Sequence, residues 1–78
     1  MKIYGYEKDL NENEDIIPSE LAEITLVADS NELRMIAEFI LNTADTMDEM
    51  AENYDHEHLS DKNKNFISSP HFVVARPR

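Results

Sequence analysis

Residues 29–54 read DSNELRMIAEFILNTADTMDEMAENY, and this stretch decides the fold. Asp29 is placed to cap the first amides of a helix, and Glu32, three residues later, completes a capping box. Apolar and small side chains then recur at spacings of three and four, which predicts one buried stripe about 100° wide. The stripe comprises Leu33, Ile36, Ala37, Ile40, Ala44, Met47, Ala51 and Tyr54. We expect a helix over about 30–53, with Asn53 in the left-handed conformation that ends a helix.

The segments on either side of this helix predict three strands. Residues 20–28 alternate between apolar and polar side chains, which is typical of a strand with one buried face. Residues 2–7 and 71–76 are rich in β-formers, and residues 54–69 read as irregular. The order is β-β-α-β over a single domain, 1–78. It predicts a small two-layer α+β fold in which one long helix packs on one face of a three-stranded mixed sheet. The first two strands would pair antiparallel, and the third would follow a right-handed crossover to lie parallel to the second.

The composition limits the class of protein. A chain of 78 residues is long enough for one hydrophobic core. Cysteine is absent, which excludes disulfides and thiolate chemistry. The amino-terminal residues lack the apolar run of a signal peptide, and no stretch has the ~18 apolar residues of a membrane span. We therefore expect a cytoplasmic protein with no membrane partner.

The charges are divided unevenly along the chain. All seventeen acidic residues lie between Glu7 and Asp61, and the first 61 residues contain only three basic ones. Residues 62–78 contain four basic residues and no acidic one, and the whole chain has a formal charge of −10. Nucleic acids and anionic membranes require clustered Lys and Arg, so neither is expected as a partner. The charge favours a basic protein as partner.

The acidic residues of the helix suggest where such a partner would bind. The last two turns contain acidic residues but no Lys or Arg, although the negative end of the helix dipole favours cations. Several of these acids are like-charge pairs four residues apart, which destabilise a helix. We interpret them as a partner-binding surface made of Glu38, Asp45, Asp48, Glu49, Glu52 and Asp55. The alternative is a solvated helix face that only keeps the protein soluble.

Residues 55–61 contain two histidines that suggest a metal site. His56 and His58 would point the same way from an extended segment, and they could share a divalent metal with Asp55, Asp61 or His71. The alternative is that one histidine lies at the helix carboxy terminus and the others form local hydrogen bonds. Apart from this metal we expect no cofactor. A single glycine cannot build a phosphate-binding loop or an oxyanion hole, so we do not expect an enzyme.

Four pieces of the chain together resemble a known family. They are Leu26–Asp29, Glu32–Phe39, the Asp55–Asp61 segment, and Pro70 ahead of Phe72–Val74. Their order over about 22–76 resembles bacterial immunity proteins from polymorphic toxin systems, in particular immunity protein family thirty-two. This resemblance implies a compact α+β domain that neutralises a cognate toxin by binding it. It highlights His56, His58 and Asp61, and it implies no catalytic role.

Three hypotheses about function therefore stay open. The first is an acidic binding module of the immunity or inhibitor type, directed against a basic partner such as a cognate toxin; mimicry of nucleic acid is a variant of it. The second is a metal-stabilised domain that uses the His56/His58 segment. The third is a homo-oligomer, for example a homodimer, joined through the open sheet face or through Phe39 and Met50. Tyr4 and Tyr6 would either form an aromatic platform on the open face or pack in the core.

Overall fold

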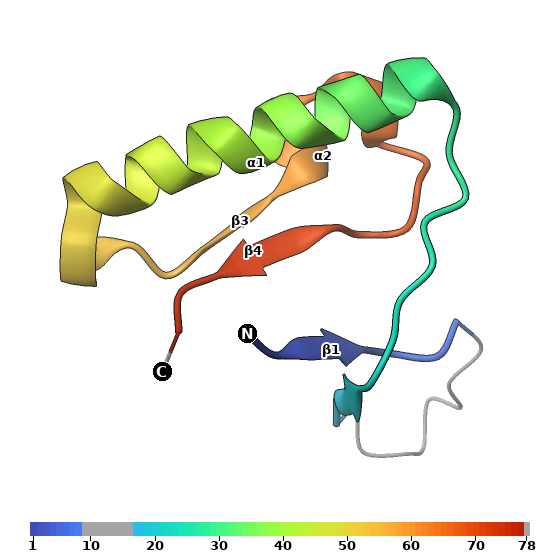
Figure 1. Cartoon of the computed structure of the whole chain (residues 1–78), viewed down its shortest axis with the longest axis horizontal. Helices are drawn as coiled ribbons and strands as arrows, with labels where there is room; N and C mark the ends of the chain where they lie inside the picture. The colour runs from blue at the N-terminus through green and yellow to red at the C-terminus, as the bar shows by residue number, and fades with distance from the viewer. Residues whose placement is uncertain (9–16, 78) are drawn as a thin grey trace.

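The computed structural model of the chain describes residues 1–8 and 17–77 (Figure 1). One long helix, α1 (Ser30–Met50), follows a small hairpin and precedes a second strand pair. The remaining elements are β1 (Ile3–Gly5), β2 (Ser19–Leu21), the 3₁₀ turn η1 (Ala51–Asn53), β3 (His56–His58), α2 (Leu59–Lys62), the 3₁₀ turn η2 (Lys64–Phe66) and β4 (Val73–Ala75). No helix among the described residues combines the length and the apolar character that a membrane span needs.

The start of α1 confirms the predicted capping box. The Glu32 amide donates to the Asp29 carboxylate at 2.8 Å, and the Asp29 amide donates to the Glu32 carboxylate at 3.1 Å. The end of the helix differs from the prediction. The residue with positive φ is Ala51, at 49°, and Asn53 lies in the 3₁₀ turn that follows. The chain therefore leaves the α-helix three residues earlier than the sequence pattern predicts.

The strands form two separate two-stranded antiparallel sheets, and the predicted three-stranded mixed sheet is wrong. The first two strands pair antiparallel as expected, with Tyr4 opposite Glu20. β4, however, pairs antiparallel with β3, with Glu57 opposite Val74. β3 lies in the segment predicted to be irregular, and it is closer to β4 along the chain than residues 20–28 are. A shorter connection costs less loop-closure entropy, which favours this pairing.

Residues 22–28 do not continue the second strand. β2 ends at Leu21, although the alternating pattern predicts a strand to residue 28. The apolar side chains of this segment, Ile24, Leu26 and Val27, are exposed. Alternation predicts a strand only where a sheet face is available to bury the apolar side. In the described part of the chain this segment leads from the hairpin to α1 without joining either sheet.

α1 packs through a different stripe from the predicted one. Its buried residues are Ile36, Phe39 and Thr43, whereas Leu33 and Ile40 are 45% and 44% exposed. At 100° per residue, the observed buried stripe is rotated by roughly a quarter turn about the helix axis from the predicted stripe. The rotation buries the large Phe39 ring in place of several small alanines. The Phe39 and Phe72 rings lie edge to face, with their centroids 6.2 Å apart.

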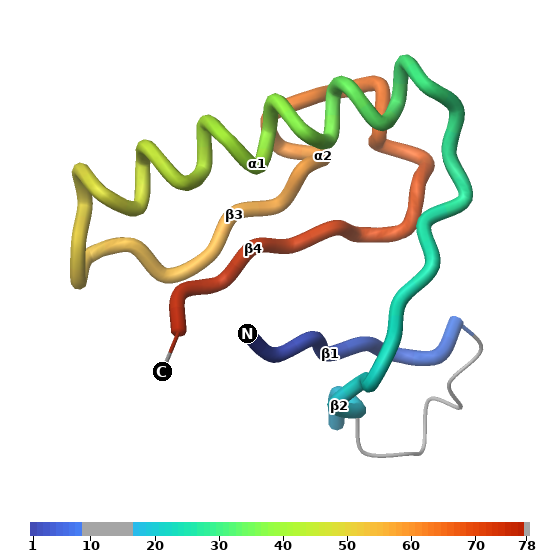
Figure 2. The backbone as a smooth tube through the Cα atoms, in the orientation of Figure 1, coloured from blue at the N-terminus to red at the C-terminus, as the bar shows by residue number. Residues whose placement is uncertain are grey.

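The core lies between α1, the short helices and the β3–β4 sheet. It consists of Ile36, Phe39, Leu59 and Phe66, and Met35, Phe72 and Val74 pack against it. In the view of Figures 1 and 2, α1 lies along one side of β3–β4, and the β1–β2 hairpin lies beyond β4 on the other side. Tyr4 and Tyr6, on and just after β1, are exposed, so neither packs in the core.

Candidate functional site

The five predicted binding residues of α1 and η1 share one exposed surface. At 100° per residue the four residues on α1 fall within an arc of about 100°, on the side of the helix away from Phe39, and the exposed Glu52 follows in η1. Among the described residues no ion pair involves any of them. The only basic side chain of α1, Arg34, donates to the side-chain oxygen of Asn31 at 3.2 Å. We call this surface the acidic face; its members are Glu38, Asp45, Asp48, Glu49 and Glu52.

The sixth predicted residue, Asp55, lies just beyond the acidic face, where the chain turns back toward β3. Its carboxylate is 2.6 Å from Nδ1 of His56. Its backbone carbonyl accepts a hydrogen bond from the amide of Arg76 at 3.0 Å. The Arg76 guanidinium in turn donates to the carbonyl of Glu52 in η1. Arg76, just after β4, thus supplies the cation that the last turns of α1 lack. The sequence near the helix end does not reveal this contact, because Arg76 is distant in the chain.

Tyr54 anchors this end of the helix to the sheet. Its side chain is only 1% exposed, and its hydroxyl donates to the carbonyl of Val74 at 2.6 Å. Burial raises the pKa of the Tyr54 phenol above 10.0, and the neighbouring Glu57 and Asp55 carboxylates raise it further. Tyr54 therefore stays protonated and keeps its hydrogen bond at neutral pH.

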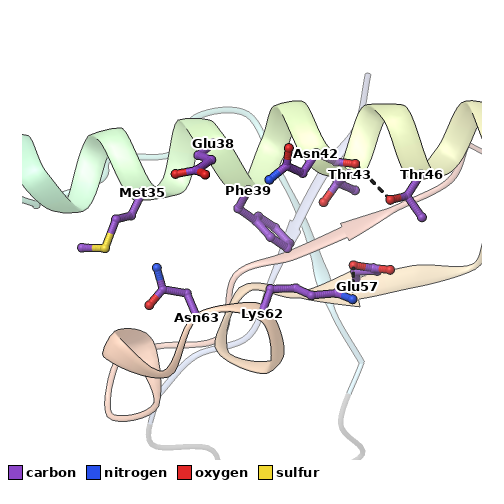
Figure 3. Close-up of a pocket in the computed structure, with 9 residues that line it drawn as sticks. All are labelled: Met35, Glu38, Phe39, Asn42, Thr43, Thr46, Glu57, Lys62 and Asn63. Atoms are coloured by element: carbon purple, nitrogen blue, oxygen red, sulfur yellow. Dashed lines mark hydrogen bonds and ion pairs between the residues drawn. The ribbon is translucent and has the colours of Figure 1, made fainter.

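A groove of about 320 Å³ runs beside the acidic face, between α1 and the β3–α2 segment (Figure 3). The predicted binding residues include only one of its lining residues, Glu38. Opposite α1, Lys62 and Glu57 form an ion pair at 3.5 Å. The lining residues are Met35, Glu38, Phe39, Asn42, Thr43, Thr46, Glu57, Lys62 and Asn63. A signal for this groove was present in the sequence, because Asn42, Thr43 and Thr46 interrupt the apolar residues on one side of the helix.

The structure places all four predicted metal ligands near β3. His56 and His58 both lie on β3 with ring centroids 5.3 Å apart, and the ring centroid of His71 lies 5.6 Å from that of His58. Asp61 lines a hollow of about 250 Å³ together with His56 and His58. The three rings lie edge to face, and in the described part of the chain no three His, Asp or Glu side chains are arranged to hold a metal ion.

The metal hypothesis therefore requires the three rings to turn so that their nitrogens converge, and it stays a prediction. A rise in melting temperature on adding Zn²⁺ that His56→Ala abolishes would support it. Equal melting temperatures with and without Zn²⁺ would contradict it.

Comparison with known families identifies the class of protein. The model of the family described as immunity protein 32 matches residues 23–77, more than half of the chain. The chain belongs to the immunity protein 32 family. This confirms the resemblance drawn from the sequence. No curated protein and no solved structure has significant similarity to the chain.

The extent of the match separates two parts of the chain. The part matched by immunity protein 32 runs from residue 23 to residue 77 and includes α1, β3, α2 and β4, with the acidic face, the groove and the three histidines. The β1–β2 hairpin precedes it. The family indicates an immunity-type protein, and immunity protein families are typically non-enzymatic and bind a cognate toxin.

Proposed function

We propose that the chain is a cytoplasmic immunity protein that neutralises a basic cognate toxin by binding it through the acidic face. The observation that carries this proposal is the set of five exposed carboxylates on one side of α1 and η1. None of the five takes part in an ion pair among the described residues. Repulsion between them destabilises the helix slightly, and a basic partner would relieve that repulsion. Charges arranged in this way speed association by electrostatic steering.

The groove supports the same proposal, because Glu38 belongs both to the acidic face and to the groove lining. Asn42 adds a further hydrogen-bond acceptor there, while Glu57 on the opposite wall is paired with Lys62 (Figure 3). A Lys or Arg side chain of the toxin would therefore bind on the Glu38 side of the groove while the surrounding toxin surface lies on the acidic face. Residues Asp55 and His56 would lie at the edge of this contact.

The test is a comparison of two charge-reversed variants of equal net charge. Asp45→Lys/Glu49→Lys changes the acidic face, and Glu20→Lys/Glu23→Lys makes the same change in charge at exposed positions in and after β2. Each protein, with the unchanged chain, serves as bait in lysate of the native cell at low and high salt. We expect the unchanged chain and the β2 control to retain a basic protein at low salt and to release it at high salt. We expect the acidic-face variant to retain little of it.

Protection of cells that express the captured protein provides the functional readout. If the captured protein is the toxin, its expression arrests growth, and the unchanged chain and the β2 control restore it. The acidic-face variant should fail to restore growth although circular dichroism shows an intact helix. Equal retention and equal protection by all three proteins would exclude the acidic face as the toxin-binding surface.

A further inference from the structure

One flank of α1 is apolar and uncovered. Leu33 and Ile40 are close to half exposed, and Met47, two turns beyond Ile40, is half-buried. Exposed alanines occupy the positions between them. We call this flank the seam; along the helix it consists of Leu33, Ala37, Ile40, Ala44 and Met47. The spacing alternates between four and three residues, which is the spacing of helices that pack along one another in coiled coils.

We propose that the seam is the interface between two copies of this chain, with their α1 helices antiparallel about a twofold axis at the level of Asn42. In this arrangement, seam residues at equal distances on either side of Asn42 face each other. Ile40 and Met47 then each meet an alanine, which lets the two helices interdigitate closely. The facing pairs are Ile40 with Ala44, and Met47 with Ala37 of the second copy. The seam is therefore complementary to itself, as a twofold interface requires.

The residues that flank the seam fit the same arrangement. Arg34, Leu41 and Asp48 follow one another at intervals of seven residues beside the seam. In an antiparallel pair this flank faces the same flank of the second copy, so Leu41 meets Leu41 and Arg34 meets Asp48. Leu41 is 68% exposed in the single chain although acidic residues surround it. The second copy accounts for this exposure and gives Arg34, the only basic residue of α1, an acidic partner.

The surface available to a second copy comes from the seam and the residues beside it. Leu33, Ile40 and Leu41 are 45%, 44% and 68% exposed, and Ala37 and Ala44 between them are exposed as well. A second copy would remove these apolar side chains from water.

The charge of the chain does not oppose the arrangement at the seam itself, because all five seam residues are uncharged. Glu38, Asp45 and Glu49 lie farther round the helix and remain exposed in the dimer. The dimer would thus present these residues of the acidic face twice, while Asp48 faces Arg34 of the second copy. Because the net charge of −10 repels the second copy, added salt should strengthen the dimer, while salt weakens binding of a basic toxin.

Sedimentation equilibrium of the full chain is the first test. We expect a mass of twice 9.0 kDa at micromolar concentration that falls toward the monomer mass on dilution. Ile40→Glu places a charge in the seam and should raise the dimer dissociation constant by at least about tenfold. Ile67→Glu, at an exposed position outside the seam, is the matched control and should leave it unchanged. A monomer mass at all concentrations, or equal effects of the two substitutions, would overturn the proposal.

Charge exchange keeps the test valid if Ile40→Glu fails to fold. Arg34→Asp alone and Asp48→Arg alone should each weaken the dimer, because each places like charges opposite one another. The double variant Arg34→Asp/Asp48→Arg restores opposite charges and should recover dimer affinity. If the double variant is as weak as the sum of the two single changes, Arg34 does not face Asp48 of a second copy.

Chemical cross-linking tests the antiparallel orientation, and the chain suits it because it contains no cysteine. In the antiparallel dimer Leu41→Cys places two thiols beside the twofold axis, where a short bis-maleimide should join them. Arg34→Cys places its two thiols about sixteen residues apart along the helices, about 24 Å, beyond the reach of the same reagent. Cross-linking of both variants would indicate parallel helices, and cross-linking of neither would indicate another interface, so either result would overturn the proposal.

Discussion

At the scale of single residues, Tyr54 joins two parts of the molecule that are far apart in the sequence. Its ring is buried at the end of α1, and its hydroxyl bonds to a β4 carbonyl twenty residues away. The sequence pattern predicts a buried Tyr54, because it continues the helical stripe by one turn. The partner of its hydroxyl was not predictable, since the pairing of β4 with β3 places Val74 there.

Removal of this hydroxyl tests its contribution to stability. We expect Tyr54→Phe to lower the free energy of unfolding by about 0.5–1.5 kcal/mol, because the Val74 carbonyl loses its buried donor. Urea denaturation followed by circular dichroism measures the change. Tyr4→Phe removes a hydroxyl from an exposed ring and should change the free energy of unfolding by less than about 0.5 kcal/mol. Equal losses in the two variants would contradict the role of the Tyr54 hydrogen bond.

The pH dependence of stability follows from the raised pKa of Tyr54. The folded chain holds the phenol proton more tightly than the unfolded chain does. The stability contributed by the neutral phenol is therefore complete below about pH 10, and it is lost as the pH rises through the folded-state pKa. We expect the free energy of unfolding to fall more steeply between pH 9 and 11 in the unchanged chain than in Tyr54→Phe. Identical slopes would show that another group controls this pH range.

At the scale of elements, the position and the amino-terminal cap of α1 were predictable, and its rotation about its own axis was not. The capping box depends on residues three apart, so local sequence specifies it completely. The apolar residues of α1 extend around more than half of the helix, and this pattern fits two orientations. The choice depends on α2, η2 and the residue before β4, which place Leu59, Phe66 and Phe72 against Met35, Ile36 and Phe39.

Two neighbouring positions on α1 distinguish the observed orientation from the predicted one. Phe39→Ala should lower the free energy of unfolding by about 3–5 kcal/mol, because it leaves a cavity in the core. Leu41→Ala, two residues later at an exposed position, should cost less than about 0.5 kcal/mol. Both are measured by chemical denaturation at chain concentrations low enough that association does not contribute. A larger loss for Leu41→Ala than for Phe39→Ala would contradict the observed packing of α1.

The candidate site was also predictable only in part, because local sequence specifies some of its residues and distant contacts place the others. The residues of the acidic face were all named from the sequence, because charged side chains stay in water whichever apolar side of α1 is buried. His56 and His58 were expected to point the same way, and the short strand β3 places their rings 5.3 Å apart. The groove was missed, because its two walls come from α1 and from the β3–α2 segment, which reads as irregular.

At the scale of the whole molecule, one chain leaves a large apolar area in contact with water. The seam and residues 22–28 together expose Ile24, Leu26, Val27, Leu33 and Ile40. A small domain has little core to offset such exposure, so association is the expected response. The proposed dimer and the proposed toxin complex share Asp48 but otherwise use different residues of α1, and they respond to salt in opposite directions. An experiment at two salt concentrations can therefore assign each variant to one of the two associations.

The sequence by itself determined the charge distribution, the long capped helix, the antiparallel pairing of the first two strands and the family. Each of these depends on composition, on contacts between residues close in the chain, or on the order of short patterns. Only the tertiary structure decided the strand partners of β3 and β4, the side of α1 that is buried, and the cation at the helix end. These depend on contacts between distant residues, where competing arrangements have similar local propensities, and packing of the larger side chains selects one of them.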